Sequence, residues 1–157
     1  MSSTVADRIE VECPLSTVYN QWTQFEEFPR FMGGVESVRQ LDDTTLHWTA
    51  SIGGVTREWD ARIVDQEPDQ RIAWEATTGA TNRGVVTFRP VDATHTEVNL
   101  ELEFEGEGFV EKVGEKLGLV EGQAKADLER FKEYIEARQV ETGGWRGEVD
   151  ETGQARG

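Results

Sequence analysis

Hydrophobic and polar residues alternate with a period of two through most of the first two thirds of the chain. From residue 35 to residue 105 the alternation is almost continuous, and it is clearest at the end, where apolar residues occupy positions 98, 100, 102 and 104. Strict alternation is typical of a β-strand with one buried face and one wet face. Gly53-Gly54 lies between two such runs and predicts a two-residue hairpin turn. With an earlier run at about residues 5–12, the pattern predicts seven antiparallel strands.

Helical periodicity is confined to two regions. Apolar residues at positions 15, 18, 19 and 22 follow Pro14, which suits the first turn of a helix, and Pro29 interrupts the aromatic run at residues 25–32. We therefore expect two short helices, or a helix and a turn, after the first strand. Later in the chain, apolar residues recur at intervals of three and four from Val113 to Ile135, which predicts an amphipathic helix of about thirty residues.

The order of these elements predicts a single α+β domain over residues 1–140. Sequential antiparallel strands bend around a helix where bulges and glycines permit it. We expect a curved seven-stranded antiparallel sheet wrapped around the long C-terminal helix, with a hollow between them. Residues 141–157 are rich in Gly, Glu and Thr without periodicity, which predicts a flexible acidic tail, with Trp145 and Arg146 as the residues able to dock it.

Charge narrows the possible partners. The 157 residues include 31 acidic and 16 basic ones, for a net charge of −15. Such a surface repels phosphate backbones and anionic lipid headgroups, so we expect no nucleic-acid partner and no electrostatic docking to membranes. Solubility explains this charge, and a high-salt habitat is the alternative explanation.

The single cysteine, Cys13, excludes an internal disulfide and a multi-cysteine metal site, and its position is typical of a small buried thiol. The first residues lack the pattern of a signal peptide. No apolar run approaches the ~20 residues that span a bilayer. We therefore expect a cytoplasmic protein without stable membrane insertion.

The aromatic segment at residues 25–32 (FEEFPRFM) runs into residues 35–38 (VESV). This segment, together with the element order, resembles the START-like superfamily. The resemblance is closest to the branch that contains polyketide cyclase/dehydrase-like and coenzyme Q-binding proteins, and it covers about residues 3–140. It implies the helix-grip fold, with a long apolar cavity that holds lipids, quinones, polyketides or other hydrophobic molecules.

The aromatase/cyclase members of this superfamily carry an inward tryptophan and, further along the same strand face, an inward arginine that acts on the substrate. The matching face here contains Trp59, Ala61 and Ile63, while Arg62 points the other way. Ile63 therefore fills the arginine position, which argues against cyclase chemistry. Arg57 shares the face of Trp59 and could anchor a polar group at the cavity mouth.

Large rings at inward positions are the strongest sign of a binding site. Trp48, Trp59 and Trp74 fall on separate strands, and packing of the core is the alternative explanation for each ring. An indole N–H needs a hydrogen-bond partner, which a ligand oxygen can supply. The complete predicted ligand-binding set comes from the sheet, the short helices and the start of the long helix: Trp22, Phe28, Phe31, Trp48, Trp59, Trp74, Phe88, Phe104, Val113 and Leu117.

Other chemistry finds little support in the sequence. His47 lies on the polar face of its strand and His95 lies in a loop, so the two histidines form neither a metal site nor a triad. The glutamates at positions 97, 101, 103 and 105 share a wet strand face. No glycine pair stands in a nucleotide-binding context. We expect no metal and no cofactor.

Three functions remain. The first is a non-catalytic carrier, sensor or chaperone of a hydrophobic small molecule such as a lipid, quinone or polyketide. The second is a cyclase, aromatase or dehydratase that steers a reactive polyketide by shape, with Arg57 and Tyr19 as its candidate catalytic residues. The third is a protein-interaction module whose acidic surface or long helix docks a basic partner.

Overall fold

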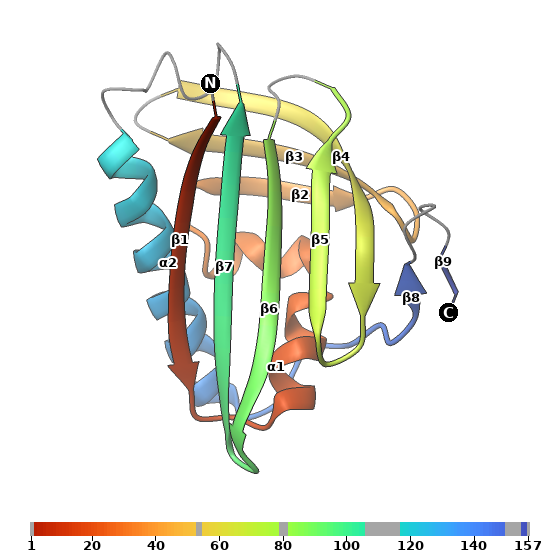
Figure 1. Cartoon of the computed structure of the whole chain (residues 1–157), viewed down its shortest axis with the longest axis vertical. Coiled ribbons are helices and arrows are strands. Elements are labelled where there is room, and N and C mark those ends of the chain that lie inside the picture. The colour runs from red at the N-terminus through yellow and green to blue at the C-terminus, as the bar shows by residue number, and fades with distance from the viewer. Residues whose placement is uncertain (1, 53–54, 79–81, 106–116, 150–154, 157) are drawn as a thin grey trace.

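The chain folds as a curved antiparallel sheet with the long helix on its concave side (Figure 1). A computed structural model describes residues 2–52, 55–78, 82–105, 117–149 and 155–156. In chain order the elements are β1 (Ser2–Val11), α1 (Leu15–Trp22), the 3-10 helix η1 (Phe25–Arg30), β2 (Val35–Gln40), β3 (Thr45–Ile52), β4 (Val55–Glu67), β5 (Arg71–Ala76), β6 (Asn82–Asp92), β7 (His95–Glu105), α2 (Leu117–Arg138), β8 (Glu148–Val149) and β9 (Ala155–Arg156). The predicted α+β architecture is confirmed.

The main sheet has the order β1-β7-β6-β5-β4-β3-β2, so each strand from β2 to β7 pairs with its neighbour in sequence. β1 departs from this rule and pairs along its whole length with β7, from Ser2 opposite Glu105 to Val11 opposite Thr96. Ile52 pairs with Val55, so two residues join β3 to β4, as Gly53-Gly54 predicts. The two-stranded piece β8–β9 joins the sheet through β4.

Curvature comes from irregular pairing at three places. The register shifts between Val35 and Ser37 in β2, between Ile63 and Asp65 in β4, and between Pro90 and Asp92 in β6. Bulges of this kind bend a strand and increase its twist. β2, β3 and the first part of β4 consequently run across the direction of β1, β7 and β6 (Figure 1). The long strand β4 belongs to both halves of the sheet.

The second half of α2 supplies one wall of the core. Ala124, Leu128, Phe131 and Ile135 are buried at intervals of three and four residues, as the helical pattern predicts. The expected start of this helix at Val113 lies outside the described residues. No helix in the described ranges is long and apolar enough to cross a membrane.

Residues 141–149, the first half of the segment predicted to be a flexible tail, pack against α1 and β4. The N–H of Thr142 donates to Gln21 Oε1 at 2.9 Å, and the N–H of Trp145 donates to Thr23 Oγ1 at 3.0 Å. Val149 is buried and pairs with Gln66 of β4. Most of these contacts are polar, so the hydrophobic pattern of the sequence does not predict them.

Candidate functional site

Three indole rings stack on the concave face of the sheet. Trp48 of β3 lies 6.0 Å from Trp59 of β4, with the ring planes 5° apart, and 5.9 Å from Trp74 of β5, with the planes 22° apart. We call these three rings the indole stack. Trp48 and Trp59 are direct cross-strand partners, which is the arrangement in which aromatic rings on one sheet face interact. The inward orientation predicted for all three is therefore observed.

A glycine on the neighbouring strand makes room for the third ring. Gly84 of β6 is the cross-strand partner of Trp74. A Cβ atom at Gly84 would lie 2.6 Å from Cζ2 of Trp74 and 3.1 Å from a methyl group of Leu102. The indole of Trp74 thus lies against backbone that carries no side chain.

The indole stack is not completely sealed. Trp48, Trp59 and Trp74 keep 4%, 8% and 6% of their surface exposed, although each lies on the concave side of the sheet. Nε1 of Trp48 is buried and has no hydrogen-bond partner within the described part of the chain. Because buried polar groups are normally paired, this N–H is a natural point of contact for an acceptor oxygen.

A second group of rings forms a closed core beside the stack. Trp22 of α1 lies 5.4 Å from Phe28 and 5.9 Å from Phe31, and Phe131 of α2 lies 5.1 Å from Phe31. Most of these contacts are edge-to-face, and the rings are essentially fully buried. Phe28 also lies 5.7 Å from Trp48 and so joins the closed core to the indole stack. Phe28 is thus the member of this core that contacts the indole stack, and the ligand contact expected of Trp22, Phe28 and Phe31 stays a prediction.

Of the remaining predicted ligand-binding residues, the structure describes the side chain of Phe88 only. Phe88 of β6 faces the concave side, where its ring lies 6.4 Å from Trp22. Phe104 lies in β7 and Leu117 begins α2, but their side chains, and all of Val113, are outside the described residues. The wall of the expected pocket that they would form stays a prediction.

Arg57 and Tyr19, the two candidate catalytic residues, occupy opposite kinds of environment. Arg57 is half-buried and stands opposite Ala50, two residues before Trp59 on the same strand face. Among the described residues its guanidinium has no ion-pair partner, which leaves it available to a ligand. Ile63 is buried and Arg62 exposed, as the alternation predicts.

Tyr19 is fully buried on α1. Its hydroxyl accepts a hydrogen bond of 3.2 Å from Nε2 of Gln66, and its ring lies 5.3 Å from Phe88. Burial raises the pKa of Tyr19 to about 12, against which the bond from Gln66 acts only in part. A phenol with this pKa stays protonated at neutral pH and is a poor general base.

The other titratable candidates stay outside the concave face. His47 bonds to Asp60 at 2.7 Å and to Glu58 at 3.2 Å on the outer side of β3 and β4. Burial raises the pKa of the Cys13 thiol, which makes it unreactive. Within the described ranges no three His, Cys, Asp or Glu side chains are grouped so as to hold a metal ion.

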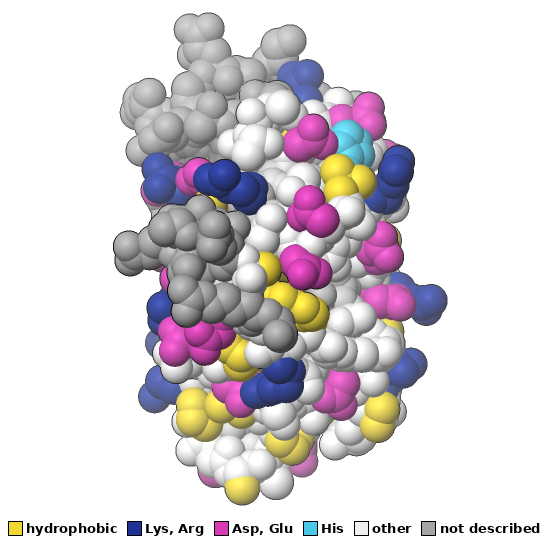
Figure 2. Space-filling model, turned by 90° about the vertical axis from the view of Figure 1, so that its right-hand side faces the viewer, with side chains coloured by type: hydrophobic (Ala, Val, Ile, Leu, Met, Phe, Trp, Pro, Cys, Tyr) yellow, Lys and Arg dark blue, Asp and Glu magenta, His cyan; other side chains and the backbone are white. Residues whose placement is uncertain are grey.

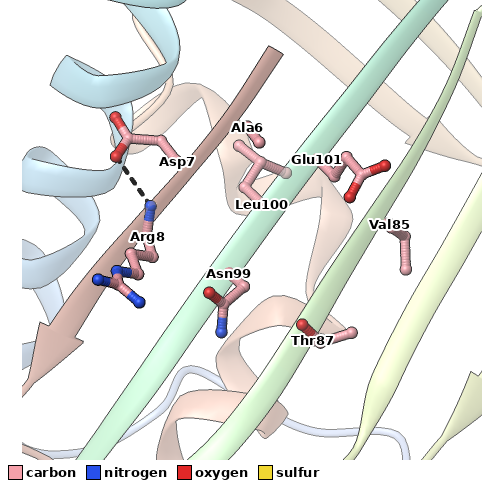
Figure 3. A pocket seen from close by; sticks show the side chains of 8 residues that line it. All are labelled: Ala6, Asp7, Arg8, Val85, Thr87, Asn99, Leu100 and Glu101. Carbon is pink, nitrogen blue, oxygen red and sulfur yellow. Dashed lines mark hydrogen bonds between the residues drawn. The ribbon is translucent and has the colours of Figure 1, made fainter. Parts of the chain in front are cut away.

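The outer face of the sheet carries a shallow hollow of about 410 Å³ across β1, β7 and β6. Figure 3 shows its mixed lining, in which five polar or charged side chains lie among three apolar ones: Asp7, Arg8, Thr87, Asn99 and Glu101 among Ala6, Val85 and Leu100. A side chain lining of this polarity does not suit an apolar ligand. On the side of the molecule in Figure 2, acidic and basic residues are likewise interspersed with small separate hydrophobic groups. The concave face therefore remains the stronger candidate for a hydrophobic ligand.

Comparison with known proteins agrees with this geometry. A family model for polyketide cyclase/dehydrase and lipid transport proteins matches residues 11–133. An uncharacterized 17.2 kDa protein of Streptomyces lincolnensis is 54% identical over 148 residues, which cover 94% of this chain and 99% of that protein. A crystal structure from Deinococcus radiodurans is 30% identical, with a TM-score of 0.70, and the match covers 87% of this chain and 98% of that one.

The Zhui aromatase/cyclase from Streptomyces sp. R1128 has a TM-score of 0.77 at 18% identity, over 92% of this chain and 100% of that one. This likeness shows a common fold. The curved sheet that grips α2 is the helix-grip fold of the START-like superfamily, as the resemblance implied. Within it, the chain belongs to the polyketide cyclase/dehydrase and lipid transport family.

Proposed function

We propose that this protein binds a small hydrophobic molecule against the indole stack on the concave face of the sheet. Flat indole surfaces offer a large apolar contact area for a ring or a chain. The observation that carries the proposal is the buried N–H of Trp48, which lacks a partner in the described part of the chain. A ligand oxygen would satisfy it.

The site favours a ligand with an apolar body and at least one acceptor oxygen, such as a polyketide, a quinone or a lipid. Arg57 lies on the same face toward the β3–β4 hairpin and can anchor a carbonyl or carboxylate at that end. We assign a carrier, sensor or chaperone role in the cytoplasm. The isoleucine at position 63, where the aromatase/cyclases carry an inward arginine, is the reason for preferring binding to turnover.

Titration with Nile red, a neutral dye with an apolar body and a carbonyl group, tests the site. Trp48→Phe keeps an aromatic ring but removes the N–H, and we expect about three- to tenfold weaker binding because a neutral hydrogen bond contributes about 1 kcal/mol. Trp22→Phe is the matched control: its Nε1 is also buried without a partner in the described ranges, but it lies in the closed core. Equal losses in the two variants would contradict binding at the indole stack.

Native mass spectrometry of the protein purified from its own cytosol then addresses the natural ligand. We expect a bound apolar species that is retained by the wild type and depleted in Trp48→Phe. Protein that carries no small molecule, and that binds neither Nile red nor a panel of fatty acids, quinones and aromatic polyketides, would refute the proposed function.

A polyketide cyclase, aromatase or dehydratase is the second candidate function. The family assignment and the fold shared with the Zhui aromatase/cyclase favour it. Such catalysis depends on orientation of the substrate more than on strong acids or bases. Incubation with a poly-β-keto substrate distinguishes the two functions: an enzyme would change the product spectrum, and Arg57→Ala would lose that change while Arg57→Lys kept part of it.

A further inference from the structure

Residues 141–149, which we call the C-terminal strap, are held at α1 by side chains that form hydrogen bonds with the backbone of the strap. Gln21 makes two bonds to Thr142: Oε1 accepts the backbone N–H at 2.9 Å, and Nε2 donates to the hydroxyl at 3.0 Å. Thr23 Oγ1 accepts the N–H of Trp145 at 3.0 Å. A paired set of this kind fixes the register of the strap along the helix.

Arg146 closes the end of this contact. Its guanidinium donates to Asn20 Oδ1 at 2.8 Å and to Asp69 Oδ2 at 2.6 Å, and Cζ lies 5.5 Å from the centre of the Tyr19 ring. Asn20 in turn donates to Glu141 Oε2 at 2.8 Å. One arginine thus joins α1, the β4–β5 turn and the strap. Because hydrogen bonds that involve a charged group are stronger than those between neutral groups, Arg146 is a principal anchor of the strap.

Two glycines let the strap approach the helix. A Cβ at Gly144 would lie 2.8 Å from Cγ and 3.0 Å from Cβ of Asn20, and the position of that Cβ is fixed by the helix backbone. A Cβ at Gly143 would meet only the far end of the Gln24 side chain, at 2.8 Å from Oε1. Gln24 can move its amide aside, whereas Asn20 cannot move its Cβ. Position 144 therefore requires glycine and position 143 tolerates alanine.

The surface under the strap is unusually polar for a buried one. Gln21, Thr23 and Gln66 are among the five buried polar or charged residues in the described ranges, and all three contact the strap. If the strap left, water would solvate these three polar side chains, while the Tyr19 ring beneath Arg146 and the side chain of Val149 would lose their cover. Because most of the bonds that hold the strap are polar and can be replaced by bonds to water, the strap is a candidate for local opening.

We propose that the end of α1 and the two residues that follow it, Asn20 to Gln24, form with Asp69 a recognition groove for a Thr-Gly-Gly-Trp-Arg segment. The chain's own strap occupies this groove and can leave it. Gln139, at the end of α2, turns the chain back toward the groove with a φ of 58° and an N–H bonded to Ile135 O at 2.7 Å. Departure of the strap would expose Tyr19 of α1 and Gln66 of β4, which are both buried when the strap is in place. This proposal is independent of the proposed binding of a hydrophobic molecule at the indole stack.

Hydrogen exchange of the full-length chain, followed by mass spectrometry, tests the fit of the strap. Gly144→Ala should raise the exchange of amides in residues 15–24, which comprise α1 and the two residues after it, at least tenfold, because the added methyl group displaces the strap. Gly143→Ala, the matched control, should exchange within about twofold of the wild type. Identical exchange in Gly144→Ala and the wild type would overturn the proposal.

A labelled peptide of residues 141–149 tests recognition in trans. Full-length Gly144→Ala, with its groove vacated, should bind the peptide at least tenfold more tightly than the wild type, whose own strap competes. A peptide with alanine in place of Arg146 should bind at least tenfold more weakly. Failure of the peptide to bind Gly144→Ala when exchange shows that α1 is open would refute the groove, and so would equal binding of the alanine peptide. Exchange of straps between two copies, seen as a dimer at high concentration, would support it.

Discussion

The indole of Trp74 reaches its position in the stack because Gly84 has no side chain beneath it. The two residues face each other across β5 and β6, and any Cβ at position 84 would enter the van der Waals radius of the ring. The φ angle at Gly84 is not in the left-handed region, so the backbone alone would accept alanine. The requirement for glycine at position 84 is therefore one of space, set by a ring on another strand.

Gly84→Ala should shift the Trp74 ring and with it the stack on Trp48. We expect a loss of about 1–3 kcal/mol of unfolding free energy, the usual result of overpacking a core, and a changed tryptophan emission maximum. Denaturant unfolding followed by fluorescence measures both. Gly143→Ala, which meets only the mobile end of Gln24, is the control and should change neither. A Gly84→Ala protein as stable as the wild type would mean that the ring lies elsewhere.

Strands β3 and β4 are also joined on their outer side, where His47 lies between two carboxylates. Hydrogen bonds that His47 donates to Asp60 and, with a smaller effect, to Glu58 raise the pKa of His47 above its ordinary value. The imidazole is 29% exposed and the two carboxylate side chains 41% and 65% exposed. Solvent therefore limits this pairing to the range of surface ion pairs, about 0.2–1 kcal/mol.

The sign of the pH dependence follows from the raised pKa. The folded state binds the His47 proton more tightly than the unfolded state, so the stabilisation is complete below the unfolded pKa of about 6.5 and is lost as pH rises through the folded pKa. We expect the difference in unfolding free energy between the wild type and His47→Asn to shrink between pH 6 and pH 8. His95 is present in both proteins and cancels. A difference that grew with pH would contradict the pairing.

The whole molecule carries a net charge of −15, and its acidic side chains outnumber the basic ones about two to one. Several of the basic residues are engaged in ion pairs, among them Arg71 with Asp65 and Arg89 with Glu97. The excess carboxylates repel one another in the folded state more than in the expanded unfolded chain. Self-repulsion of this kind opposes folding and is screened by salt.

Raising sodium chloride from 0.05 M to 1 M should therefore raise the melting temperature, since each kcal/mol of repulsion removed corresponds to about 2–4 °C for a domain of this size. Calorimetry at both concentrations measures the shift. Sucrose at equal osmolality is the control for effects that are not electrostatic. A melting temperature lowered by salt would show that the ion pairs, and not the excess carboxylates, dominate the surface.

Much of the architecture was predictable because periodicity is a local property of a sequence. Alternation placed Trp48, Trp59 and Trp74 on one face, and it placed Ile63 inward and Arg62 outward. Apolar residues from Ala124 to Ile135 defined the buried side of α2. The resemblance of residues 25–38 supplied the family that residues 11–133 then matched.

The division of the rings into two groups was not predictable from the sequence. Trp22 and Trp48 are both tryptophans at inward positions, and only their neighbours distinguish them: Phe131 closes on one group, while the indole stack keeps some exposure. The burial of Tyr19 beneath Arg146 was equally hidden. No local pattern signals a contact between residues that lie more than a hundred positions apart.

Sequence alone thus determined the strands β1 to β7 and the buried faces of the strands and helices, because each depends on the period of burial within a few residues. The pairing of β1 with β7 and the short strands β8 and β9 have no such local signal. Tertiary structure decided which rings interlock and which stack, and which glycines are obligatory. It also decided where residues 141–149 lie. These features depend on distances between atoms from separate elements, such as Gly84 beneath Trp74 and Gly144 against Asn20, and those distances exist only once the sheet has curved around its helix.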